Sequence, residues 1–197
     1  MKHVALEKSR LEAFSDGVIA VIITIMVLEM RVPHGNDLPA LRSVGPTFVA
    51  YVISFVNVGI YWNNHHHLLR AADGIDGRAM WANLHLLFWL SLIPFVTAWV
   101  GQNPSAPLPT AVYAAVLTCA GTAFTLLSLA LVAVNGKEST IARGVGSNRK
   151  GIASIVTYAL AIPVAFVAPW LSDILVVAVA LMWFVPDRRM ERVLVEE

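Results

Sequence analysis

The chain contains 197 residues, of which 57% are hydrophobic and only 14% are charged. Soluble domains carry about 25% charged residues, so the composition excludes an ordinary soluble domain and indicates a membrane protein. The formal net charge of +1 says little, because in a membrane protein the position of each charge matters more than the total. The single cysteine, Cys119, excludes an intrachain disulfide.

Six apolar segments approach or exceed the length of about 20 residues that a helix needs to cross a bilayer. In chain order they cover residues 11–30, 46–69, 79–100, 108–134, 151–168 and 170–186. The connections between them are short and rich in helix-breaking residues, so none is a separate domain. The last two segments are separated only around Pro169, which favours a tight helical hairpin. The sequence therefore predicts an all-α integral membrane protein in which residues 1–197 form a single six-span domain.

The positions of Lys and Arg predict the orientation of these six spans. Twelve of these residues fall on the side of the N-terminus, and only Arg31 and Arg42 fall on the other side. The larger group consists of Lys2, Lys8, Arg10, Arg70, Arg78, Lys137, Arg143, Arg149, Lys150, Arg188, Arg189 and Arg192. Cytoplasmic loops are enriched in Lys and Arg, so both termini are predicted to be cytoplasmic.

The first apolar segment carries an ionisable residue, Asp16. A charged side chain at the bilayer centre costs about 2.5–3.5 kcal/mol even on lenient scales, so such a residue marks a functional site or a satisfied polar network. On a helical wheel with 100° per residue, Val21, Ile25 and Leu28 share one face, and Asp16 points away from it. Phe14 and Asp16 therefore lie on different sides of this helix, with Phe14 beside the apolar stripe.

Two interpretations of the stripe formed by Val21, Ile25 and Leu28 remain open. The first is that these side chains face lipid or a neighbouring helix. The second is that they line a narrow hydrophobic pore, in which rings of apolar side chains gate by dewetting. One helix per chain cannot enclose a pore, so the second interpretation requires symmetric copies of the chain.

The end of the second segment and the start of the third contribute further polar residues at about the depth of Asp16. Polar groups in hydrocarbon must find partners. We therefore predict a hydrogen-bonded cluster that joins the first segment to the second and third. Its expected members are Arg10, Ser15, Asp16, Trp62, His66 and Asn83.

Three consecutive histidines, His65, His66 and His67, raise the question of a metal site. Successive helical side chains diverge by about 100°, so these three cannot converge on one ion by themselves, and we expect no metal. The sequence contains no Walker loop, no GxSxG and no HExxH, so we expect no enzyme and no nucleic-acid partner. Two alternatives stay open: a proton-coupled transporter that uses Asp16 and His65–His67, and a membrane enzyme that uses the histidines.

Several motifs resemble those of a known family. Arg10-xxx-Phe14-Ser15-Asp16-Gly17, followed by Thr24 and Leu28-Glu29, is similar to the signature of the bacterial relatives of a lysosomal potassium channel called transmembrane protein 175. Trp62-xx-His65-His66 also matches, as does Asn83-Leu84 with the Ser-Leu-Ile-Pro-Phe-Val-Thr run at 91–97. The resemblance covers the first three spans and is only general over the last three.

The resemblance implies a homotetramer of six-span subunits in the bacterial inner (plasma) membrane, with the first helices around a central pore. It implies a potassium channel without a Thr-Val-Gly-Tyr-Gly filter, whose partners are lipid and monovalent cations and whose only small-molecule requirement is the permeant ion. The resemblance places the constriction on the stripe Val21, Ile25 and Leu28, with Thr24 as a possible pore hydroxyl. It assigns a structural network to Arg10, Phe14, Ser15, Asp16, Trp62, His66 and Asn83.

One residue departs from the family pattern. Val21 is smaller than the isoleucine or leucine that often occupies the main constriction of the family. A shorter side chain predicts a wider constriction and weaker discrimination of potassium from sodium.

Overall fold

The computed structural model describes residues 2–146 and 148–184, and within these ranges the secondary structure is helical. The helices are α1 (Lys2–Leu28), α2 (Leu38–Ser43), α3 (Gly45–Arg70), α4 (Gly77–Ser91), α5 (Ile93–Gln102), α6 (Pro107–Asn135), α7 (Thr140–Val145), α8 (Arg149–Val167) and α9 (Pro169–Phe184). The all-α prediction is therefore confirmed. The expected end of the last span at residues 185–186, and Arg188, Arg189 and Arg192, lie outside the described residues.

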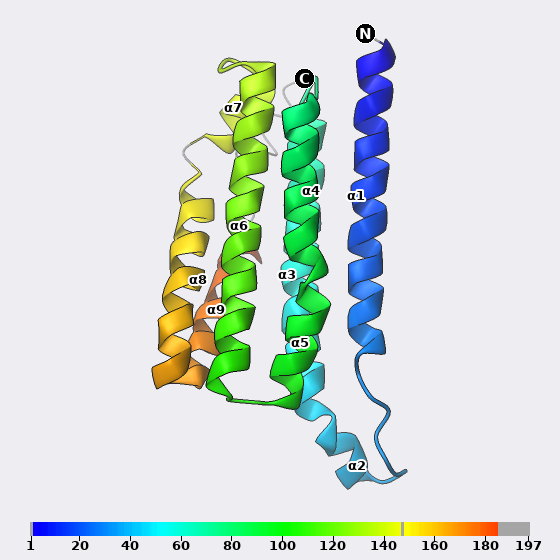
Figure 1. Cartoon of the computed structure of the whole chain (residues 1–197), viewed down its shortest axis with the longest axis vertical. Helices are drawn as coiled ribbons and strands as arrows, with labels where there is room; N and C mark the ends of the chain where they lie inside the picture. Colours follow the sequence, from blue (N-terminus) through cyan, green and yellow to red (C-terminus); the bar gives the residue numbers. More distant parts are fainter. Residues whose placement is uncertain (1, 147, 185–197) are drawn as a thin grey trace.

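The long helices run alternately up and down in one bundle (Figure 1). Helix α1 stands at one edge, α3, α4 and α5 form the middle, and α6, α8 and α9 form the other side. The short helix α2 extends from one end of the bundle, and the short helix α7 lies at the opposite end. Because α1 packs mainly against the middle helices, a large part of its surface is left outside the subunit core.

Five segments are long and apolar enough to cross a membrane by length and composition. They are the 8–28 part of α1, then α3, the combined α4–α5 segment, α6 and α8. Helix α9 is apolar but shorter, with 16 described residues. The hairpin expected around Pro169 is present, since only Ala168 separates α8 from α9.

The third expected span, 79–100, is broken into α4 and α5 at Leu92. The physical reason is Pro94, which has no backbone N–H to continue the helical hydrogen-bond ladder and whose ring clashes with the preceding turn. The chain continues in the same direction after the break, because Leu92 itself keeps right-handed helical dihedral angles (φ −84°, ψ −13°). The result is one long segment with a joint near its middle.

Two kinds of close packing hold the bundle together. Ala120 and Ala123 of α6 and Ala161 and Ala165 of α8 are completely buried, and such small side chains let membrane helices approach closely. Helices α3 and α5 meet at Gly101, where a Cβ atom would lie 2.7 Å from the Cα of Thr47. Only glycine fits at that contact.

Candidate functional site

Helix α1 has two different faces. Leu11, Ser15, Ile19, Ile22 and Met26 are buried, with exposed fractions of 7% or less, and they pack against the middle of the bundle. A different face carries the predicted stripe, whose side chains are exposed by 53% at Val21, 39% at Ile25 and 80% at Leu28. The stripe is therefore not part of the subunit's own core. Phe14 lies exposed on the same side.

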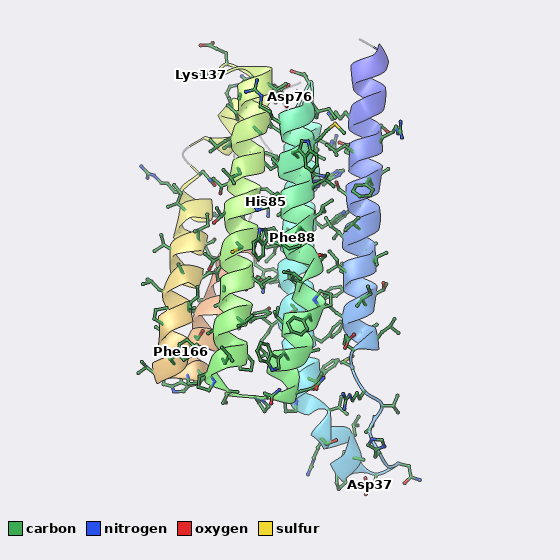
Figure 2. All side chains as sticks on the ribbon, in the orientation of Figure 1. Asp37, Asp76, His85, Phe88, Lys137 and Phe166 are labelled. Atoms are coloured by element: carbon green, nitrogen blue, oxygen red, sulfur yellow. The ribbon has the colours of Figure 1, made fainter. Side chains whose placement is uncertain are left out.

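The exposed face of α1 and the adjoining face of α5 enclose a groove of about 910 Å³, here called the α1–α5 groove. Figure 2 shows side chains of α1 directed both toward the middle helices and toward the open side. The groove walls are mostly apolar and include Phe14, Val18, Val21 and Ile25 of α1 and Pro94, Phe95, Ala98 and Trp99 of α5. Thr24 lies exposed beside the stripe, and its hydroxyl donates to the Val21 carbonyl at 2.9 Å. Val21 and Ile25 thus face open space rather than a tightly packed neighbour.

A buried polar cluster holds α1 to α3 and α4 from behind. Asn83 of α4 is completely buried; its Nδ2 donates to the Ser15 Oγ at 2.9 Å, and its Oδ1 lies 2.7 Å from the His65 Nε2. Because an amide oxygen can only accept, the His65 Nε2 carries the proton. Ser15 in turn donates to the Leu11 carbonyl at 2.8 Å. Each polar group in this chain of hydrogen bonds has a partner, as burial requires.

A second contact joins α1 directly to α3. The Trp62 Nε1 donates to the Asp16 Oδ1 at 3.0 Å. The Trp62 ring also stacks on His66, with centroids 6.1 Å apart and an interplanar angle of 24°. Asp16, the carboxylate inside an apolar segment, therefore belongs to a polar network rather than to the exposed stripe. We call the contacts among Ser15, Asp16, Trp62, His65 and Asn83 the anchor.

The anchor differs from the predicted cluster at two positions. His65, rather than His66, makes the hydrogen bond to Asn83, because His65 lies on the buried side of α3 with Val58, Leu68 and Leu69. The spacing of these residues, seven before and three and four after His65, is the sequence signal that identifies it. Arg10 is exposed and lines a shallow groove with Phe14 and Leu84, and within the described residues it makes no hydrogen bond to the anchor.

The three histidines point in different directions. His65 faces Asn83, His66 stacks on Trp62, and the ring of His67 lies edge-on to that of His66. In the part of the chain that the structure describes, no three His, Cys, Asp or Glu side chains gather so that they could hold a metal ion.

Replacing Trp62 by phenylalanine tests the contact between Trp62 and Asp16. The ring over His66 is kept, whereas the hydrogen bond to the Asp16 carboxylate is lost, so we expect the free energy of unfolding to fall by about 1–2 kcal/mol. Thermal unfolding of purified protein in one detergent measures the difference. Trp81→Phe is the matched control, because Trp81 is 75% exposed. Equal stability of the two variants would contradict a stabilising role for the contact.

Comparison with known proteins places this arrangement in context. The sequence profile of a family described as endosomal/lysosomal potassium channel TMEM175 matches residues 10–94. A potassium channel from Chryseobacterium sp. (strain P1-3) is 45% identical over 191 residues, which cover 97% of this chain and 100% of the relative. The Homo sapiens protein named endosomal/lysosomal proton channel TMEM175 is 36% identical over 124 residues, covering 57% of this chain and 23% of that protein.

A solved structure is also similar. The crystal structure of a lysosomal potassium-selective channel TMEM175 homolog from Chamaesiphon minutus superimposes with a TM-score of 0.79 at 26% sequence identity. The similarity covers 90% of this chain and 96% of that one. The stripe and the anchor both fall inside the range matched by the family profile.

The bundle of apolar helices and these relatives together identify a multi-pass membrane protein that is an ion channel. The family and the relatives are channels and not enzymes. The chain belongs to the TMEM175 family.

Proposed function

We propose that this chain is the subunit of a homotetrameric, potassium-permeable channel whose pore is lined by α1. The observation that carries the proposal is the pair of faces on α1: an exposed apolar stripe on one side and the anchor on the other. A pore helix has to present one face to the permeant ion, and it needs fixed contacts behind that face to hold the pore width.

The spacing of the stripe suits a layered constriction. Val21, Ile25 and Leu28 follow one another at about one helical turn, so symmetric copies would form three apolar rings roughly 4.5–6 Å apart. Narrow apolar rings exclude water and gate by dewetting, and an ion that passes them must shed part of its hydration shell. Potassium holds its shell less tightly than sodium, so such rings favour potassium. The Thr24 hydroxyls would add a polar ring between the layers.

The subunit contacts of α1 support assembly from several copies. Only one face of α1 packs within the subunit, and the α1–α5 groove leaves apolar walls open. Exposed apolar surface of this kind marks an interaction site, and closed cyclic symmetry is the usual way in which copies enclose an axis. The number four comes from the resemblance to the family. The relative from Chryseobacterium is named a potassium channel, which supports the choice of ion.

The distribution of charge supports an orientation with both termini in the cytoplasm of a bacterial inner membrane and with α9 as the sixth span. Figure 2 shows Asp76 and Lys137 at one end of the bundle and Asp37 at the other. Arg31 and Arg42 lie toward the end near Asp37. Lys and Arg concentrate at the opposite end, which by the positive-inside rule is cytoplasmic: Lys8, Arg10, Arg70, Arg78, Lys137, Arg143, Arg149 and Lys150.

Reversal potentials test the choice of ion and the role of the first ring. With potassium on one side of a planar bilayer and sodium on the other, we expect a reversal potential whose sign shows that potassium is more permeant than sodium. Val21→Ile should raise the potassium-to-sodium permeability ratio several-fold, because a longer side chain narrows the ring. Val27→Ile is the matched control, since Val27 lies on another face of α1. A strongly potassium-selective wild type that Val21→Ile leaves unchanged contradicts a width-limited Val21 ring.

The alternative function is a proton-coupled transporter that uses Asp16 and His65–His67, and the name of the human relative as a proton channel keeps it in view. It predicts uptake that depends on a proton gradient and saturates, rather than unitary currents. The positions of the two groups favour the channel: Asp16 bonds to Trp62 and His65 bonds to Asn83, so both take part in holding α1. Single-channel recording of the same protein distinguishes the two mechanisms.

A further inference from the structure

A second cavity lies on the far side of α5 from the α1–α5 groove. It has a volume of about 420 Å³ and is enclosed by α3, α5, α6 and α9 at the end of the bundle where α5 turns into α6. Most of its walls are apolar, including Val49, Ala50, Val100 and Val176. It shares no lining residue with the α1–α5 groove, because Thr97 and Val100 face the cavity while Phe95, Ala98 and Trp99 face the groove. We call it the α9 cavity.

One charged residue lines the α9 cavity. Asp173, in the first half of α9, is partly buried, and among the described residues that line the cavity it alone is charged. Within the described chain, its carboxylate makes no ion pair and no hydrogen bond. A carboxylate in an apolar setting is costly unless a partner offsets the charge. None of the described residues offsets this charge, so the carboxylate is available to a cationic group from outside the subunit.

The buried polar groups at the α9 cavity already have partners. The Thr97 hydroxyl donates to the Ser54 Oγ at 2.7 Å, and the Ser54 Oγ lies 2.8 Å from the Tyr113 hydroxyl. These three side chains are buried, and Thr97 and Tyr113 line the cavity. The carboxylate of Asp173 is therefore the charged group of this cavity, and no described residue forms an ion pair with it.

We propose that the α9 cavity binds a hydrophobic ammonium cation, with the ammonium group at the Asp173 carboxylate and the hydrocarbon body against Val49, Ala50 and Val176. Small-molecule sites are concave, mostly apolar and about 300–1,000 Å³ in volume, with a few polar groups that fix the orientation of the ligand. The α9 cavity meets each condition. An ion pair inside low-dielectric walls is stronger than one in water, so the carboxylate selects a cation over a neutral molecule of the same shape.

The α9 cavity is accessible without passage through the pore. Its outer wall includes Pro46 of α3 and Pro104 and Ser105 of the α5–α6 connection, at one end of the bundle. An amphiphilic amine in the adjoining leaflet or in solution reaches this end directly. Because α5 separates the cavity from the α1–α5 groove, the site is distinct from the proposed ion pathway and stands independently of it.

Equilibrium binding of radiolabelled 1-adamantylammonium to the purified full-length protein tests the proposal, with 1-adamantanol as the neutral molecule of matched shape. We expect saturable binding of one amine per chain, and weaker binding of the alcohol. Asp173→Asn, which keeps the shape of the side chain, should weaken amine binding by about tenfold or more and leave the alcohol unaffected. Asp73→Asn is the matched control, since Asp73 is exposed at the opposite end of the bundle, and it should bind as the wild type does.

A second variant checks the location of the bound amine. Ala50→Phe fills the cavity, so it should abolish binding of the amine and of the alcohol alike. If the wild type and Asp173→Asn bind the amine equally well, Asp173 does not contribute to amine binding, and the proposal is overturned. Binding that survives Ala50→Phe but is lost in Phe95→Ala places the amine in the α1–α5 groove and overturns it as well.

Discussion

Potassium current through the Ile25→Cys channel is expected to fall about tenfold or more when a positively charged thiol reagent is added. The adduct would place a bulky cation in a narrow apolar ring, where it blocks passage and repels the permeant ion. Raising the barrier by ~1.4 kcal/mol is enough for a tenfold effect. Because Cys119 is also a free, partly exposed thiol, the experiment uses a Cys119→Ser background. The readout is current in planar bilayers before and after the reagent.

Two control positions make this experiment decisive. Ile22 borders the same groove as Ile25 but is buried against the middle helices, and Val27 is exposed on another face. Ile22→Cys should not react, and Val27→Cys should react without a large loss of current. If modification at position 25 leaves the current unchanged, or if all three positions respond alike, α1 does not line the ion pathway.

Asn83→Ala is expected to lower the free energy of unfolding by about 2–5 kcal/mol. The change removes both side-chain hydrogen bonds of Asn83 and leaves the Ser15 hydroxyl and the His65 ring without these partners, each at a cost of about 1–3 kcal/mol. Since α1 is then held mainly by apolar contacts, the fraction of assembled protein should fall as well. Thermal unfolding and size-exclusion chromatography in the same detergent measure the two effects.

Asn103→Ala is the matched control for this loss of stability. Asn103 is exposed, and its side chain donates only to the Trp99 carbonyl one turn before it. We expect a change within about 0.5 kcal/mol there. In a double-mutant cycle, Ser15→Ala and Asn83→Ala should be non-additive, because the two residues share a hydrogen bond. Additive losses would show that the bond between them contributes nothing to stability.

The sequence predicted the helices of this bundle well where apolar runs end at clear breakers. The second and fourth spans were expected at 46–69 and 108–134, and the helices cover Gly45–Arg70 and Pro107–Asn135. Membrane helices are predictable in this way because every backbone polar group must be satisfied inside the segment. The division of the third span at Leu92 was not predicted. Pro94 sits inside an apolar run, and hydropathy alone does not register the missing backbone hydrogen bond.

For the site, the sequence predicted only what helical periodicity determines. Periodicity decides which side chains share a face, so it separated Asp16 from Val21 and Ile25. It does not decide how far a helix is rotated toward its neighbour, and this rotation determines that His65 rather than His66 meets Asn83. The α9 cavity was not predictable at all, because its shape depends on the packing of four helices.

The contacts of α4 and α5 with α3 have a mechanical consequence. The combined segment is clamped to α3 at one end by the hydrogen bond between Asn83 and His65, and at the other by the backbone contact of Gly101 with Thr47. Its proline joint lies between the two clamps, where the helical hydrogen-bond ladder is already interrupted. A helical segment that is fixed at both ends bends most easily where its hydrogen-bond ladder is interrupted. The compliant part of the wall facing α1 is therefore the stretch around Leu92 and Pro94, while the two ends of that wall stay in place.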